Sequence, residues 1–88
     1  MAHAVTATRK DEANEIATEV RVWMARRRMT QRELGEAAGH DQTWVSKRLS
    51  GKVPMTIEDL LDLADALDVR AIDFFRLDDG QSINYRSA

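Results

Sequence analysis

Apolar residues recur at helical spacing through most of the chain, and no stretch shows the strict alternation of a half-buried strand. We therefore predict an all-α fold with five helices. The first helix begins near Thr8 or Asp11 and ends at Arg28, and the others lie at about 31–38, 42–50, 57–67 and 71–77.

The apolar stripes of these segments predict the core. The first helix contributes Ala13, Ile16, Ala17, Val20, Trp23 and Met24, the fourth contributes Ile57, Leu60, Leu61, Ala64 and Leu67, and the last turn contributes Ile72 and Phe75. Phe74 is surplus to this core, so we expect it to supply dimer contacts together with Leu77.

Three helices carry clear start signals. Thr30 followed by Glu33, and Thr56 followed by Asp59, are capping boxes in which the two side chains bind each other's backbone N–H groups. Asp41 is a good N-cap for the third helix. The acidic residues of the fourth helix recur every third position and predict its solvent-exposed face: Asp59, Asp62, Asp65 and Asp68.

The second and third helices are short and are joined by a tight turn, which is the arrangement of a helix-turn-helix. Gly39 permits the positive backbone angle that the turn needs, and Gly51 is suited to end the third helix. Gly35 costs helix propensity, which close packing of the two helices would offset. Val45 and Leu49 give the third helix one apolar edge and leave amides, hydroxyls and cations on its other faces.

Charge is distributed unevenly along the chain. The formal net charge is -2, but residues 21–52 carry eight cations and three anions, whereas residues 53–88 carry three cations and eight anions. A basic central third favours encounter with a polyanion more than the total charge suggests. The run Arg26–Arg28 is explained equally well by the dipole of the first helix and by phosphate contact.

The segment from Met29 to about Phe75 resembles the lambda-repressor and Cro-like (XRE-type) family of helix-turn-helix proteins. The stretches that carry the resemblance are TQRELGEAAG, DQTWVSKRLSG and PMTIEDLLDLADALDV. The resemblance implies a lambda-repressor-like domain that binds double-stranded DNA, with the helix at about 42–50 in the major groove. It further implies a bacterial or phage transcriptional regulator of repressor type that binds paired half-sites as a homodimer.

The same resemblance implies the DNA-binding residues. In the family a glutamine opens each motif helix, eleven positions apart, as Gln31 and Gln42 do here. The base-reading positions fall on Gln42, Thr43, Ser46 and Lys47, and phosphate contacts fall on Arg48, Ser50 and Lys52. Trp44 completes the expected site. It either packs on the protein, against the first helix or Arg48, or lies over a sugar or a thymine methyl; a partly buried structural role is favoured.

Other function classes find less support. The chain has no Cys, and His3 and His40 are isolated, so we expect no metal, no cofactor and no enzyme active site. No apolar run is long enough to span a membrane, and the N-terminus lacks a signal peptide, so we expect a cytoplasmic protein. The alternative is a protein-interaction module, such as an antitoxin or anti-repressor partner, with Trp44 as the anchor.

We expect three parts in the chain. Residues 1–10 are a flexible N-terminus, residues 11–77 are the DNA-binding domain with its motif at about 30–51, and residues 78–88 are a C-terminal tail.

Overall fold

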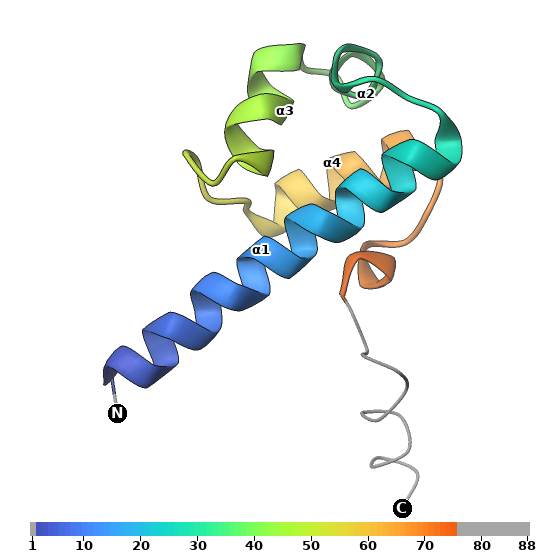
Figure 1. Cartoon of the computed structure of the whole chain (residues 1–88). Coiled ribbons are helices and arrows are strands. Elements are labelled where there is room, and N and C mark those ends of the chain that lie inside the picture. Colours follow the sequence, from blue (N-terminus) through green and yellow to red (C-terminus); the bar gives the residue numbers. More distant parts are fainter. Residues whose placement is uncertain (1, 76–88) are drawn as a thin grey trace, which may run out of the picture.

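The computed structural model describes the backbone of residues 2–75 and the side chains of residues 12–75. The expected tail at 78–88, and Leu77, lie outside these residues. The described part is all-helical, without strands, and its elements are α1 (Ala2–Arg27), α2 (Gln31–Ala37), α3 (Gln42–Leu49), α4 (Ile57–Leu67) and the 3-10 helix η1 (Ala71–Phe74) (Figure 1). The fifth helix of the prediction is therefore a single 3-10 turn.

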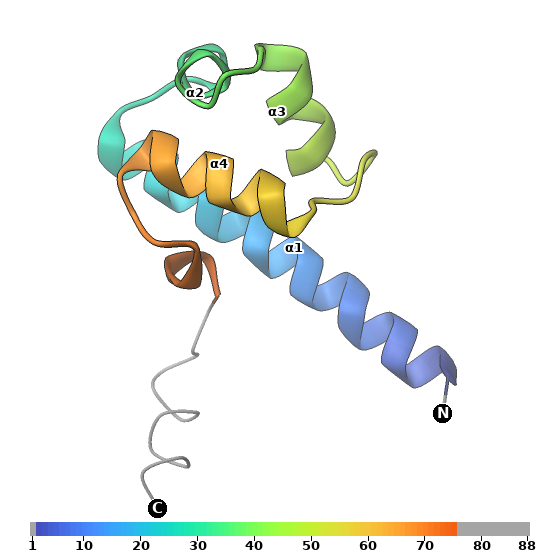
Figure 2. The same ribbon diagram turned by 180° about the vertical axis from the view of Figure 1, so that it is seen from behind.

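The helices form two groups. Figures 1 and 2 show α1 and α4 side by side, with α2 and α3 over one side of the pair and η1 on the other. The first half of α1 projects beyond the other elements. The helix begins at Ala2, earlier than predicted, because an apolar stripe marks only those turns of a helix that face a partner.

The core draws on every helix. Its fully buried large side chains are Val20, Leu34, Val45, Leu63, Leu67 and Phe74, and Ala17, Met24, Leu49, Leu60 and Ala64 complete it.

Several core predictions are wrong. Ile57, Leu61, Ile72 and Phe75 are 70%, 50%, 55% and 40% exposed, and Ala13 is also exposed. α4 has apolar residues on more than one of its faces, so the sequence pattern does not show which face is buried. The buried face includes Leu63, which the predicted stripe lacks, in place of Ile57 and Leu61. In η1 the tight 3-10 turn points Phe74 inward, and Phe74 therefore supplies no dimer contact.

The helix starts agree with the sequence prediction. The Thr30 hydroxyl accepts from the Glu33 N–H at 3.1 Å, and the Glu33 carboxylate accepts from the Thr30 N–H at 2.9 Å. Thr56 and Asp59 form the same box, at 3.0 and 3.1 Å. Asp41 accepts from the Trp44 N–H at 2.9 Å. These caps satisfy backbone donors that a helix cannot satisfy by itself.

Candidate nucleic-acid interface

The turn between α2 and α3 holds the two helices against each other. Gly39 has φ +81°, the left-handed conformation expected of it, and the His40 N–H donates to the Gly35 carbonyl at 2.8 Å. Gly35 lies directly against the backbone of Asp41, where a Cβ atom would be 3.0 Å from the Asp41 Cα and closer still to its carbonyl. The glycine that weakens α2 thus allows α3 to begin in contact with it.

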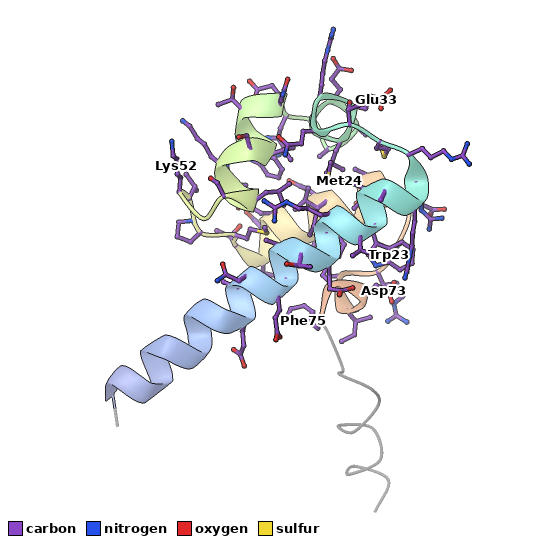
Figure 3. All side chains as sticks on the ribbon, in the orientation of Figure 1. Trp23, Met24, Glu33, Lys52, Asp73 and Phe75 are labelled. Atoms are coloured by element: carbon purple, nitrogen blue, oxygen red, sulfur yellow. The ribbon has the colours of Figure 1, made fainter. Side chains whose placement is uncertain are left out.

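The outward face of α3 is polar. Six side chains line an open hollow with a volume of about 370 Å³ on this face: Gln42, Thr43, Ser46, Lys47, Ser50 and Lys52. All six residues are exposed, and Figure 3 shows Lys52 directed away from the helices. The opposite edge of α3 is buried through Val45 and Leu49, as predicted. Six of the nine predicted site residues are thus gathered on one surface.

Ser50 and Gln31 differ from the other polar residues of the predicted site in their surroundings. The Ser50 hydroxyl donates to the Lys47 carbonyl at 3.1 Å and accepts from the Lys52 N–H at 3.5 Å, so it also closes the end of α3. Gln31 is half-buried at the start of α2, and no hydrogen bond within residues 12–75 joins its side chain to Gln42. The two amides are therefore not coupled in the unbound protein.

Arg48 is paired within the protein and is not among the residues that line the polar hollow. Its side chain is 17% exposed, and its Nε donates to Asp59 Oδ2 at 2.9 Å. Its Nη1 also donates to the Trp44 carbonyl at 3.2 Å. The expectation of a free cation at this position is wrong, because a carboxylate on α4, eleven residues further along the sequence, pairs with the guanidinium.

Burial and pairing act in opposite directions on the Asp59 carboxylate. Burial raises the pKa of Asp59, but hydrogen bonds from the Thr56 backbone and the Arg48 guanidinium outweigh it. The net result is a pKa below the ordinary value for aspartate, so the carboxylate is ionised at neutral pH. Asp59 is buried and is not part of a solvent-exposed face.

Trp44 is half-buried between two partners. The His40 ring stacks on it with centroids 3.8 Å apart and planes 1° from parallel, and the Arg48 guanidinium carbon lies 4.4 Å from its ring centroid. Two groups at these distances cannot share one face of the ring, so they flank it. Trp44 has the partly buried place that the sequence favours, with Arg48 among its partners.

Sequence reasoning missed three residues that support α3. His40 Nε2 lies 3.1 Å from Asp62 Oδ2, so Asp62 of α4 faces the turn before α3, while Asp59 of α4 faces α3 itself through Arg48. Their three-residue spacing gave no sign of this, because an acidic helix face looks the same whether water or a cation covers it.

Other cations also bind within the protein. Arg21 donates to the Leu49 carbonyl at 3.1 Å, and Arg27 donates to the Leu67 and Asp68 carbonyls at 2.8 and 3.1 Å. Arg26 lies 4.7 Å from the Trp23 ring centroid. These three arginines are exposed and keep their charge, but they use donor groups within the protein. At the polar hollow itself the cations are Lys47 and Lys52.

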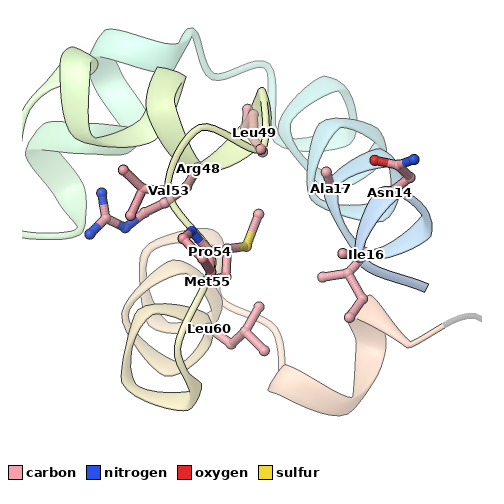
Figure 4. Close-up of a pocket in the computed structure, with 11 residues that line it drawn as sticks. Asn14, Ile16, Ala17, Arg48, Leu49, Val53, Pro54, Met55 and Leu60 are labelled. Atoms are coloured by element: carbon pink, nitrogen blue, oxygen red, sulfur yellow. The ribbon is translucent and has the colours of Figure 1, made fainter. Parts of the chain in front are cut away.

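A second hollow has a different chemistry. It has a volume of about 290 Å³ and lies between α1, the loop after α3 and the start of α4, with mostly apolar walls (Figure 4). The Arg48 stem borders it, but the guanidinium points away from it. It offers little to a polyanion, which leaves the polar face of α3 as the nucleic-acid candidate.

The comparisons agree with this architecture. The family profile described as a helix-turn-helix domain matches residues 15–73, which run from the middle of α1 into η1. No curated protein and no solved structure gives a match. Among the described residues no helix is long and apolar enough to cross a membrane. The chain therefore belongs to the helix-turn-helix domain family, which is of the DNA-binding type.

Proposed function

We propose that the chain is a sequence-specific transcriptional regulator that binds double-stranded DNA, with α2 and α3 as its helix-turn-helix and α3 in the major groove. The polar hollow on α3 carries this proposal. Amide, hydroxyl and ammonium groups match the donors and acceptors that base pairs present in the major groove.

The roles follow from position on this face. Gln42, Thr43, Ser46 and Lys47 read base edges, because they belong to the exposed turns of α3. Ser50 and Lys52 lie at its end and contact phosphates, and Gln31 contacts the backbone from the start of α2. Neither Trp44 nor Arg48 touches DNA in this proposal.

We also propose that the chain binds as a homodimer on paired half-sites, in a repressor role. Support comes from the exposed apolar side chains of α4, Ile57 and Leu61, which are 70% and 50% exposed. Sedimentation of the protein with and without a two-half-site duplex tests this directly. A single bound chain on such a duplex would contradict it.

The alternative, a protein-interaction module anchored by Trp44, has less support. An anchor at the centre of an interface is buried by its partner, but His40 and Arg48 already cover the Trp44 ring. Nothing in the arrangement of residues 12–75 favours an enzyme over a binding protein.

The test starts with selection of bound duplexes from a random pool, followed by anisotropy titrations at several salt concentrations. Affinity should fall steeply as salt rises, because bound cations displace counterions from DNA. Gln42→Ala and Lys47→Ala should each weaken the preference for the selected site by about 1–3 kcal/mol.

Asn14→Ala is the matched control, because Asn14 is an exposed amide on α1 and does not line the polar hollow. It should leave affinity and preference unchanged. Binding that does not depend on salt, or a Gln42→Ala protein with its full site preference, would contradict the proposed function.

A further inference from the structure

The buried edge of α3 does not by itself fix the orientation of the helix. α3 has eight residues and buries only Val45 and Leu49. These two positions lie one turn apart along a single line, so their burial by itself resists rotation about that line only weakly. Backbone contact with Gly35 holds the start of α3 at Asp41, and the Arg21 hydrogen bond to the Leu49 carbonyl holds its end.

A second line of contacts lies on one flank of that edge. Residues advance by about 100° around a helix, so Trp44 and Arg48 share one flank, whereas Ser46 lies on the other flank and Lys47 lies opposite the buried edge. From this flank Arg48 reaches Asp59 on α4, and Trp44 is held between Arg48 and His40, which itself lies against Asp62 on α4. We call these five residues the α3–α4 clamp.

The ion pair of the clamp is largely shielded from water and is held by several hydrogen bonds. The Arg48 and Asp59 side chains are 17% and 13% exposed, so water screens their attraction poorly. The guanidinium makes two hydrogen bonds, and Asp59 Oδ2 also accepts from the Thr56 N–H. Both charges are therefore fixed by several partners, which restricts where α3 can stand relative to α4.

We propose that Arg48 is a positioning residue for DNA recognition: through Asp59 and Trp44 it fixes the rotation of α3, and so determines base preference without touching DNA. This inference rests on the proposed function. Side-chain tips lie about 6 Å from a helix axis, so a rotation of about 10° moves them by about 1 Å. Base-edge hydrogen bonds form only at donor–acceptor distances of about 2.7–3.2 Å, and a shift of this size is larger than the width of that range.

The experiment compares Arg48→Met with Lys52→Met, since both remove one cation near the end of α3 and only Lys52 is free to meet a phosphate. Anisotropy titrations use the selected duplex and a duplex with its central bases changed, at several salt concentrations and well below each melting temperature. Arg48→Met should lower the preference for the selected duplex about tenfold, the equivalent of about one base contact at 1.4 kcal/mol, and leave the salt slope unchanged.

Lys52→Met should instead weaken binding to both duplexes alike and reduce the salt slope by about 0.9 for one lost phosphate contact. The inference is overturned if Arg48→Met shows that same pattern, which would make Arg48 a phosphate ligand. It is equally overturned if Arg48→Met only lowers the melting temperature and keeps the full preference, which would make the ion pair merely structural.

Asp59→Asn supplies a second variant, because Asp59 is on α4 and outside the polar hollow. It should also lower base preference, and the double variant with Arg48→Met should lose no more than the larger single effect, since both break one interaction. Asp65→Asn changes an exposed carboxylate of the same helix and should have no effect. Full preference in Asp59→Asn contradicts the inference, whereas absence of salt-dependent binding by the unmodified protein contradicts the proposed function instead.

Discussion

The α2–α3 pair and the layer formed by α1, α4 and η1 are stabilised in different ways. The layer holds most of the buried apolar residues, including Val20, Leu63 and Phe74. The pair buries only Leu34, Val45 and Leu49, and depends on caps, on close backbone contact at Gly35 and on the ion pair of Arg48. A short motif that must keep one face free for a partner cannot bury more, so polar and backbone contacts replace apolar burial there.

The largest expected effect tests the apolar burial that stabilises the layer of α1, α4 and η1. Phe74 is fully buried, whereas its neighbour Phe75 is 40% exposed. Phe74→Ala should therefore lower the free energy of unfolding by about 3–5 kcal/mol, because it leaves a cavity between packed helices. Thermal denaturation followed by circular dichroism measures the loss. Phe75→Ala is the matched control and should cost less than half as much; equal losses would mean that the two residues contribute alike.

A smaller effect tests the backbone contact within the pair. In an ordinary helix Gly→Ala stabilises by up to about 1 kcal/mol, but Gly35→Ala should destabilise by about 1–3 kcal/mol, because the new Cβ meets the Asp41 backbone. Urea denaturation gives the sign. Gly39→Ala is the control: apart from its chain neighbours, no residue comes within 4 Å of its Cβ position, so only its φ of +81° opposes the change, at a cost of about 1 kcal/mol. A stabilised Gly35→Ala protein would show that the two helices can separate without penalty.

The smallest expected effect is a change with pH in the free energy of unfolding, and it tests the ion pair between Arg48 and Asp59. The pKa of Asp59 is lower in the folded protein than the value of about 3.9 in an unfolded chain. A carboxyl of this kind stabilises the fold above the unfolded pKa, and the contribution is lost as pH falls through the folded pKa. The unmodified protein should thus exceed Asp59→Asn in stability by about 1 kcal/mol at pH 7, and the difference should shrink below about pH 4.

Asp65→Asn is the reference for this profile, since it should differ from the unmodified protein by less than about 0.5 kcal/mol at neutral pH. Denaturant titrations at a series of pH values measure both differences. If the Asp59→Asn difference stays constant down to pH 3, the ionised carboxylate contributes nothing to the fold.

Local features of the sequence were sufficient to predict where α2, α3 and α4 begin and where the turns at Gly39 and Gly51 lie. Thr30, Asp41 and Thr56 bind backbone groups only three residues away, and Gly39 and Gly51 adopt the positive φ angles that their turns need. None of these interactions depends on a distant part of the chain. The outward polar face of α3 followed from the same kind of reasoning, because Val45 and Leu49 fix its buried edge.

The sequence by itself thus determined α2, α3 and α4, their caps and the turn that joins α2 to α3. Only the tertiary structure decided which of two adjacent phenylalanines is buried, and that Arg48 pairs with Asp59 and does not face outward. The physical reason is range: a cap or a turn is completed by neighbours in sequence, whereas the partner of a long cationic side chain, or the face of a short 3-10 turn that meets the core, depends on where other helices pack.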